Sequence, residues 1–222
     1  MRLILLGLPG AGKGTQAKIL ARDKGLLHVS TGDMFREAAA EGTDLGKQAQ
    51  EYMSAGKLVP DEVTIGMLLE RISKPDAAAG LMLDGFPRTI PQAEALDAAL
   101  AKQGSQIDAV LYMVVPEPEL MERLTGRWSC GACGAIYHTQ TKPPKAAGVC
   151  DECGSALSQR ADDQADTVKA RLDTNRAWTE ALAEYYGKQG KLHEVDGTGD
   201  PGAITGRLLG ALQGVSAEGQ RA

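Results

Sequence analysis

Short apolar runs alternate with stretches of helical periodicity along most of the chain. Five runs, each followed by polar, glycine or proline residues, predict strands: Arg2–Leu6, Leu26–Val29, Leu81–Leu83, Ala109–Val115 and Leu192–Val195. Runs that are apolar throughout are typical of strands buried on both faces of a parallel sheet. Between them, apolar residues recur at helical spacing over Lys13–Lys24, Pro91–Gln103 and Gln164–Tyr186. This pattern predicts an α/β fold with a doubly wound sheet.

Two segments interrupt the alternation. Thr31–Val59 is polar and helix-rich, and Gly126–Asp163 has little helical periodicity and contains all four cysteines. We expect both to be insertions, spanning residues 30–59 and 126–163, in a core made of residues 1–29, 60–125 and 164–214. The final residues, 215–222, are small and polar, and we expect a disordered tail there.

Length and charge narrow the class of protein. The 222 residues suffice for one domain with insertions, whose core needs no disulfides. The formal net charge of −5 argues against a protein that coats nucleic acid. No apolar segment approaches the ~18 residues of a membrane-spanning helix, and the apolar start Met1–Leu6 is too short for a signal peptide. We expect a cytoplasmic protein without nucleic-acid or membrane partners.

A glycine-rich segment, Gly7–Thr15, joins the first predicted strand to the first predicted helix. Glycines let backbone N–H groups converge on one anion, and a lysine there can reach terminal phosphates. The motif G-x-x-x-x-G-K is complete and ends at Lys13, which predicts nucleotide binding. It continues with Gly14 and Thr15 instead of an immediate Ser or Thr, which favours nucleotide kinases over GTPases. A glycine turn with an incidental lysine is the alternative, whereas the dehydrogenase fingerprint G-x-G-x-x-G is not met.

The four cysteines form two Cys-x2-Cys pairs separated by sixteen residues: Cys130, Cys133, Cys150 and Cys153. Two such pairs can close a tetrahedral four-thiolate zinc site, which leaves no open position and is therefore structural. His138 lies nearby, but we expect it not to be a ligand because four thiolates complete the site. Two disulfides are one alternative. A nucleic-acid-binding zinc ribbon is another, disfavoured because the segment is about charge-neutral and lacks a basic and aromatic run.

Further motifs follow the glycine loop in a fixed order. They are Ser30–Arg36, Gly56–Asp61, Leu83–Thr89, Arg160–Asp163 and Val195–Gly197, together with Gln92, Arg123, Arg127 and Arg171. Over the chain to about Leu212, the sequence resembles bacterial adenylate kinases of the long-lid type. The resemblance implies a P-loop fold with a parallel five-stranded sheet, helices on both faces, and two mobile insertions, a monophosphate-binding segment and a lid. It also implies a monomer that catalyses the Mg²⁺-dependent reaction ATP + AMP ⇌ 2 ADP.

The resemblance assigns roles to individual residues. Those around the transferred phosphoryl group would be Lys13, Arg88, Arg123, Arg160 and Arg171. ATP would bind to Gly10, Ala11, Gly12, Lys13, Gly14, Thr15, Arg127, Ile136, Tyr137 and Gly199. AMP would bind to Thr31, Arg36, Lys57, Leu58, Val59, Gly85, Phe86, Pro87, Arg88, Gln92, Arg160 and Arg171. Asp84, at the end of the third predicted strand, would hold Mg²⁺ through water.

Several of these residues have structural alternatives. Any single arginine can be a solvated surface residue. Tyr137 can belong to a small core within the lid, and Asp84 can cap the end of a strand. Asp163 can cap the helix that starts near Gln164, or meet the arginines together with Asp162. The four-residue spacing of Arg123 and Arg127 predicts a shared helix face.

Other enzyme functions also remain. A kinase of another monophosphate, such as UMP or CMP, or one that uses GTP as the donor, would share the phosphate loop and the arginines. A GTP-hydrolysing switch protein would need a guanine-reading Asn-Lys-x-Asp motif, which this sequence lacks. A binding-only zinc module would leave the phosphate loop unexplained.

Overall fold

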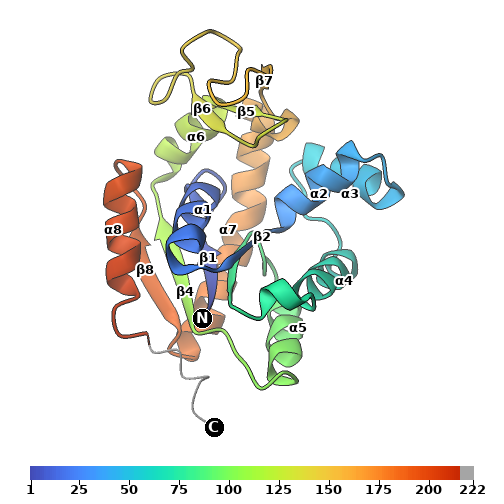
Figure 1. Cartoon of the computed structure of the whole chain (residues 1–222), viewed down its shortest axis with the longest axis vertical. Helices are drawn as coiled ribbons and strands as arrows, with labels where there is room; N and C mark the ends of the chain where they lie inside the picture. The colour runs from blue at the N-terminus through green and yellow to red at the C-terminus, as the bar shows by residue number, and fades with distance from the viewer. Residues whose placement is uncertain (216–222) are drawn as a thin grey trace.

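The structure, a computed structural model, describes residues 1–215, so the predicted tail lies outside the described residues except for Val215. Its centre is a parallel five-stranded sheet with the order β2-β3-β1-β4-β8 (Figure 1). The strands are β1 (Arg2–Leu6), β2 (Leu27–Ser30), β3 (Leu81–Asp84), β4 (Ala109–Val114) and β8 (Leu192–Asp196). All five predicted strands are confirmed within one residue at each end.

Helices cover both faces of the sheet, because alternate residues of each strand face opposite sides. Leu3 and Leu5 of β1 pack into one core cluster, and Ile4 and Leu6 pack into the other. The first cluster includes residues of α1 (Lys13–Lys24), α6 (Glu117–Thr125) and α8 (Pro201–Ala211). The second includes residues of α4 (Asp61–Ile72) and α5 (Ile90–Ala101), and α7 (Ala165–Lys188) contributes to both. The prediction of a doubly wound α/β fold is therefore confirmed.

The two segments that interrupt the sequence pattern project from this core. Helices α2 (Thr31–Ala40) and α3 (Asp44–Ser54) pack around Phe35, Ala49 and Val59. The second segment, residues 126–163, contains the antiparallel strands β5 (Arg127–Cys130), β6 (Ile136–His138) and β7 (Leu157–Ser158). In Figure 1 the strands of this segment, which we call the lid after the expectation from the sequence, lie at the top of the molecule, above α1, and α2 and α3 extend to the right. Short 3-10 helices occupy Pro75–Ala77 and Ala161–Asp163.

The predicted helix boundaries agree within two residues for α1, α5 and α7. The expectation that Arg123 and Arg127 share a helix face is wrong. Helix α6 ends at Thr125 with Gly126 as its C-cap, and Arg127 is the first residue of β5. No helix within residues 1–215 combines the length and apolar character needed to cross a membrane.

Candidate active site

The phosphate loop follows β1 and ends at the N-terminus of α1. Gly10 and Gly12 have φ angles of +87° and +92°, a region that side chains with a Cβ rarely adopt. At Gly10, a Cβ would also lie 3.0 Å from the carbonyl oxygen of Leu120 on α6. The Lys13 ammonium folds back over the loop and donates to the carbonyl oxygens of Gly7 at 2.7 Å and Leu8 at 3.0 Å. The loop thus holds its lysine beside the turn that would receive phosphates.

Lys13 stands in a strongly cationic environment. Burial is the main cause that lowers the pKa of its ammonium to about 8; the nearby charges of Arg88, Arg171 and Arg127 add to this shift, and Asp84 opposes it. A buried ammonium group among guanidinium groups is unfavourable unless anions compensate the charge. The site therefore favours a polyanionic ligand.

The arginines of this region come from separate parts of the fold. Arg88 follows β3, Arg36 belongs to α2, and Arg160 lies near the end of the lid. Burial lowers the pKa of Arg88, with Arg171 and Arg36 adding to the effect. Burial also lowers the pKa of Arg160 to about 10, and Arg36 and Arg127 contribute to that shift. The structure thus brings together guanidinium groups from the core, the first insertion and the lid, close enough to perturb one another.

Arg123, on α6, also contacts the phosphate loop. Its guanidinium donates to the carbonyl oxygen of Gly197 at 2.9 Å and to that of Ala11 at 3.5 Å, and it pairs with Glu119 one turn earlier in α6. Glu119 was not predicted from the sequence as a partner of Arg123, although a four-residue spacing on a helix favours such an ion pair.

Asp84 lies where β3 meets the phosphate loop. Its side chain is 13% exposed, and a Cβ added at Gly14 would lie 3.2 Å from its Oδ2 atom. Gly14 therefore gives the carboxylate room beside the loop. One carboxylate next to a phosphate site fits Mg²⁺, which keeps several waters and takes few protein ligands. Asp84 thus fits the predicted magnesium role.

The candidate AMP-binding residues lie in several different parts of the structure. Thr31 donates from its Oγ1 to the carbonyl oxygen of Gly85 at 2.9 Å, and the Arg88 Nε donates to the same oxygen at 2.8 Å. Leu58 and Val59 instead line a pocket of about 370 Å³, which Thr174 and Trp178 of α7 also line.

The remaining members of this set lie in the loop after β3, in α5 or in the first insertion. Phe86 is buried and is joined to Pro87 by a cis peptide bond. Gln92 is buried and bonded through both ends of its amide, whereas Lys57 is exposed. Arg36 pairs with Asp33, a partner that the three-residue spacing could have revealed.

Two residues predicted at the ATP base have clear structural contacts. Tyr137 is 3% exposed and packs in the lid core, where its hydroxyl oxygen accepts from the Asp151 N–H at 2.8 Å. This supports the alternative that its side chain is a lid core residue. Ile136 precedes it in β6 and is half-buried. Gly199, with a φ angle of +93°, lies in the loop between β8 and α8.

Asp163 does not cap α7, so that prediction is wrong. Helix α7 begins at Ala165 with Gln164 as its N-cap, and no side-chain hydrogen bond caps it within residues 1–215. Asp163 is fully buried and accepts from Arg127 at 2.8 and 2.6 Å and from Arg171 at 3.0 Å. Asp162 pairs with Arg171 at 3.2 Å. Hydrogen bonds to two cations stabilise the carboxylate more than one helix N–H would. The alternative, that these acids meet the arginines, is confirmed.

Comparison with known proteins decides the family. Residues 5–191 match the profile of the family described as Adenylate kinase. A protein named adenylate kinase from Desulforudis audaxviator is 53% identical over 212 residues, which cover 96% of this chain and 99% of that protein. The chain belongs to the adenylate kinase family. An adenylate kinase from Carboxydothermus hydrogenoformans is 54% identical over 96% of this chain and 100% of its own length. One from Archaeoglobus fulgidus is also 54% identical, over 90% of this chain and 92% of its own length. This adenylate kinase family member is thus a nucleoside monophosphate kinase.

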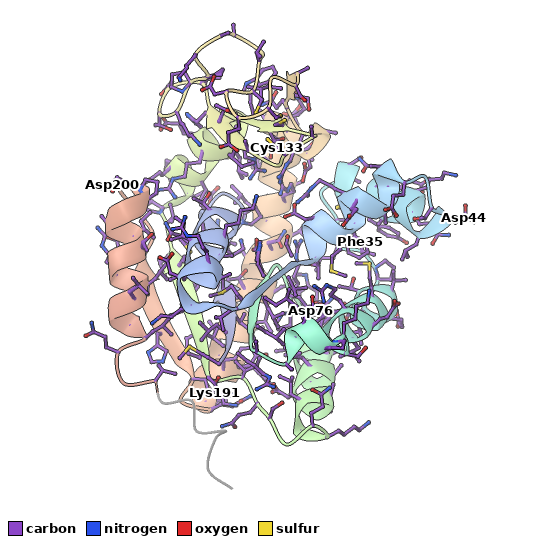
Figure 2. The ribbon with its side chains drawn as sticks, viewed as in Figure 1. Phe35, Asp44, Asp76, Cys133, Lys191 and Asp200 are labelled. Atoms are coloured by element: carbon purple, nitrogen blue, oxygen red, sulfur yellow. The ribbon has the colours of Figure 1, made fainter. Side chains whose placement is uncertain are left out.

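The four cysteines of this adenylate kinase family member form one cluster in the lid. Their sulfur atoms all lie within 4.8 Å of one another, and two of the separations are 3.4 and 3.5 Å. Thiolates around a tetrahedral zinc ion at ~2.3 Å lie ~3.8 Å apart, so the cluster has the dimensions of a zinc site. No disulfide joins cysteines within residues 1–215. Figure 2 shows Cys133 on the part of the lid above the core.

Side chains around the cluster support this assignment. A hydrogen bond from Tyr137 is the chief cause that lowers the pKa of the Cys150 thiol to about 6, which favours the thiolate that a metal needs. His138 uses both ring nitrogens elsewhere, since Nδ1 accepts from the N–H groups of Gln140 and Thr141 and Nε2 faces the carbonyl oxygen of Glu122 at 3.1 Å. Its predicted absence from the ligand set agrees with these contacts.

Proposed function

We propose that this protein transfers the γ-phosphoryl group of ATP reversibly to AMP and so forms two molecules of ADP. The observation that carries the proposal is the convergence of Lys13, Arg88 and Arg171 on one region next to Asp84. ATP and AMP carry four phosphates between them, and binding both nucleotides side by side needs such a cluster of cations. Family membership, and identity over nearly the full length to a protein named adenylate kinase, support the same reaction.

The residues supply positioning and charge, and none needs to bond covalently to a nucleotide. We assign the β- and γ-phosphates of ATP to the loop from Gly10 to Thr15. Arg36 and Arg88 hold the AMP phosphate, and Lys13, Arg88, Arg123, Arg160 and Arg171 surround the transferred group. Their fixed charges stabilise the negative charge that spreads over that group in the transition state.

Mg²⁺ accompanies ATP in this proposal, with Asp84 as its protein contact through water. When bound, the ion neutralises charge on the β- and γ-phosphates. Arg127, Ile136, Tyr137 and Gly199 form the ATP base site in this proposal, with the Tyr137 ring packed in the lid core. The AMP base lies among Thr31, Lys57, Leu58, Val59, Gly85 and Gln92.

Residues 30–59 act as the monophosphate-binding insertion and residues 126–163 as the lid, and both close on the core, which consists of residues 1–29, 60–125 and 164–214. Closure excludes water from the γ-phosphate until AMP is bound. Zinc on the four cysteines has a structural role in the lid. We propose a monomer in the cytoplasm, a compartment in which four reduced thiols persist.

An assay of ADP formation against a panel of acceptors tests this function. The purified protein is given ATP and Mg²⁺ with AMP, GMP, UMP or CMP in turn, and GTP replaces ATP in a second series. We expect AMP to be preferred by orders of magnitude as acceptor and ATP to serve as donor. Comparable rates with UMP or CMP would instead identify a kinase of another monophosphate. The Lys13→Met variant controls for contaminating kinase.

A further inference from the structure

The side-chain amide of Gln92 is held at both ends by groups of fixed hydrogen-bonding polarity. Its Nε2 donates to Oδ1 of Asp61 at 2.7 Å, and its Oε1 accepts from the backbone N–H of Arg88 at 2.8 Å. Gln92 is 1% exposed, so both bonds are shielded from water.

These two partners determine which way the amide points. A carboxylate can only accept a hydrogen bond and a backbone N–H can only donate one. If the amide turned over, its oxygen would face the Asp61 carboxylate and its NH₂ group would face the Arg88 N–H. Both contacts would then be repulsive at a site where water cannot replace the lost bonds.

Asp61 is itself fixed between two helices. It is the first residue of α4, and its Oδ2 accepts from the Oγ1 of Thr89, the N-cap of α5, at 2.8 Å. The Thr89 oxygen in turn accepts from the backbone N–H of Gln92 at 3.3 Å. The carboxylate is therefore constrained in position as well as in polarity.

The fixed amide leaves one N–H donor and one oxygen lone pair for a ligand. The Watson–Crick edge of adenine offers the complement, because N1 accepts and the 6-amino group donates. Hypoxanthine has the same ring system with the polarity reversed, since N1–H donates and O6 accepts. An amide that cannot turn over therefore distinguishes these two bases.

We propose that Asp61 is a positioning residue that sets the acceptor specificity for AMP by fixing the orientation of the Gln92 amide. The proposal rests on the proposed function, in which Gln92 faces the AMP base. A purely structural role is the alternative: Thr89 and Gln92 occupy the N-cap and third positions of α5, so the contacts could serve only to stabilise that helix.

Asp61→Asn tests the proposal, because asparagine can donate to a reversed Gln92 oxygen whereas aspartate cannot. The assay compares kcat/KM for AMP and IMP as acceptors of the ATP phosphoryl group. We expect the preference for AMP over IMP to fall about ten-fold or more, as expected for the loss of one hydrogen bond to a charged group. Some preference should remain, since the Arg88 N–H still opposes the reversed amide.

Three comparisons make the outcomes distinct. Asp76→Asn makes the same chemical change at an exposed carboxylate paired with Arg71, and it should leave the AMP/IMP ratio unchanged. Purine riboside monophosphate, which lacks the 6-amino group, should be a poorer acceptor than AMP for the unaltered protein. Gln92→Leu should reduce the AMP/IMP ratio at least as much as Asp61→Asn does.

An unchanged ratio in Asp61→Asn, or equal losses for AMP and IMP, would overturn the proposal and leave the structural role of the pair. If Asp61→Asn does not fold, Asp61→Ser is measured instead. Serine, like asparagine, lacks the carboxylate that can only accept a hydrogen bond, so the same change in the AMP/IMP ratio is expected. Failure of the unaltered protein to phosphorylate AMP would instead refute the proposed function. If Gln92→Leu preserves the ratio, Gln92 does not recognise the base, and the proposal is overturned at that residue.

Discussion

Replacing Asp163 with asparagine should destabilise the protein markedly, since this fully buried carboxylate balances two guanidinium groups. The side chains of its partners Arg127 and Arg171 are only 19% and 16% exposed. Removing one partner of a buried ion pair costs ~3–5 kcal/mol. Because asparagine keeps part of the hydrogen bonding and Arg171 retains Asp162, we expect a loss near the lower limit, ~3 kcal/mol.

Thermal denaturation followed by circular dichroism measures this loss. For a protein of this size, 1 kcal/mol corresponds to ~2–4 °C, so Asp163→Asn should lower the Tm by ~6–12 °C. The matched control is Asp76→Asn, which removes an equally bidentate but exposed partner of Arg71 and should leave the Tm nearly unchanged. If the two variants had the same Tm, the buried ion pairs of Asp163 with Arg127 and Arg171 would not stabilise the protein.

Three further predictions concern the phosphate site and the metal. Lys13→Met should reduce kcat by ~100- to 1,000-fold with an unchanged circular dichroism spectrum, and a loss below ten-fold would exclude the proposed role. The pKa of Lys13 in the free protein is lowered to about 8, so its positive charge is lost as the pH rises through that value. We therefore expect kcat/KM for ATP to decline above pH ~8. The kcat, which is measured with phosphates bound, should decline only at higher pH. Stripping the metal and then restoring the thiols should lower the Tm, since the lid core is small, but should preserve activity well below the new Tm, since none of the arginines proposed to contact phosphate is a metal ligand. Complete loss of turnover with the fold intact would make the metal catalytic.

The core and the phosphate loop could be predicted from the sequence because their signals are local. The buried part of β1 is an unbroken apolar run, which predicts a strand buried on both faces. Gly10 and Gly12 indicate a turn with a backbone conformation that only glycine adopts readily. The spacing of the four cysteines in the sequence likewise predicts that they form one cluster. These features depend on neighbours in the chain, so one sequence suffices to place them.

The partners of the charged and polar groups could not be predicted in the same way. Asp163 meets Arg127 across 36 residues, and Asp61 meets Gln92 across 31, so no periodicity joins them. Sequence spacing alone gave two wrong predictions. Asp163 lies where a helix N-cap is expected but does not cap α7, and Arg127 has the four-residue spacing from Arg123 although α6 ends before it. Tertiary contacts that satisfy buried charges prevail over these local preferences.

Transfer of a labelled phosphoryl group tests the central claim most directly. The protein is incubated with Mg²⁺ and ATP labelled at the γ-phosphate, with and without AMP, and the products are separated. We expect the label to pass from ATP to AMP and appear in ADP, with little free phosphate when AMP is absent, because closure of both insertions excludes water. Label released mainly as inorganic phosphate, independently of AMP, would contradict the account.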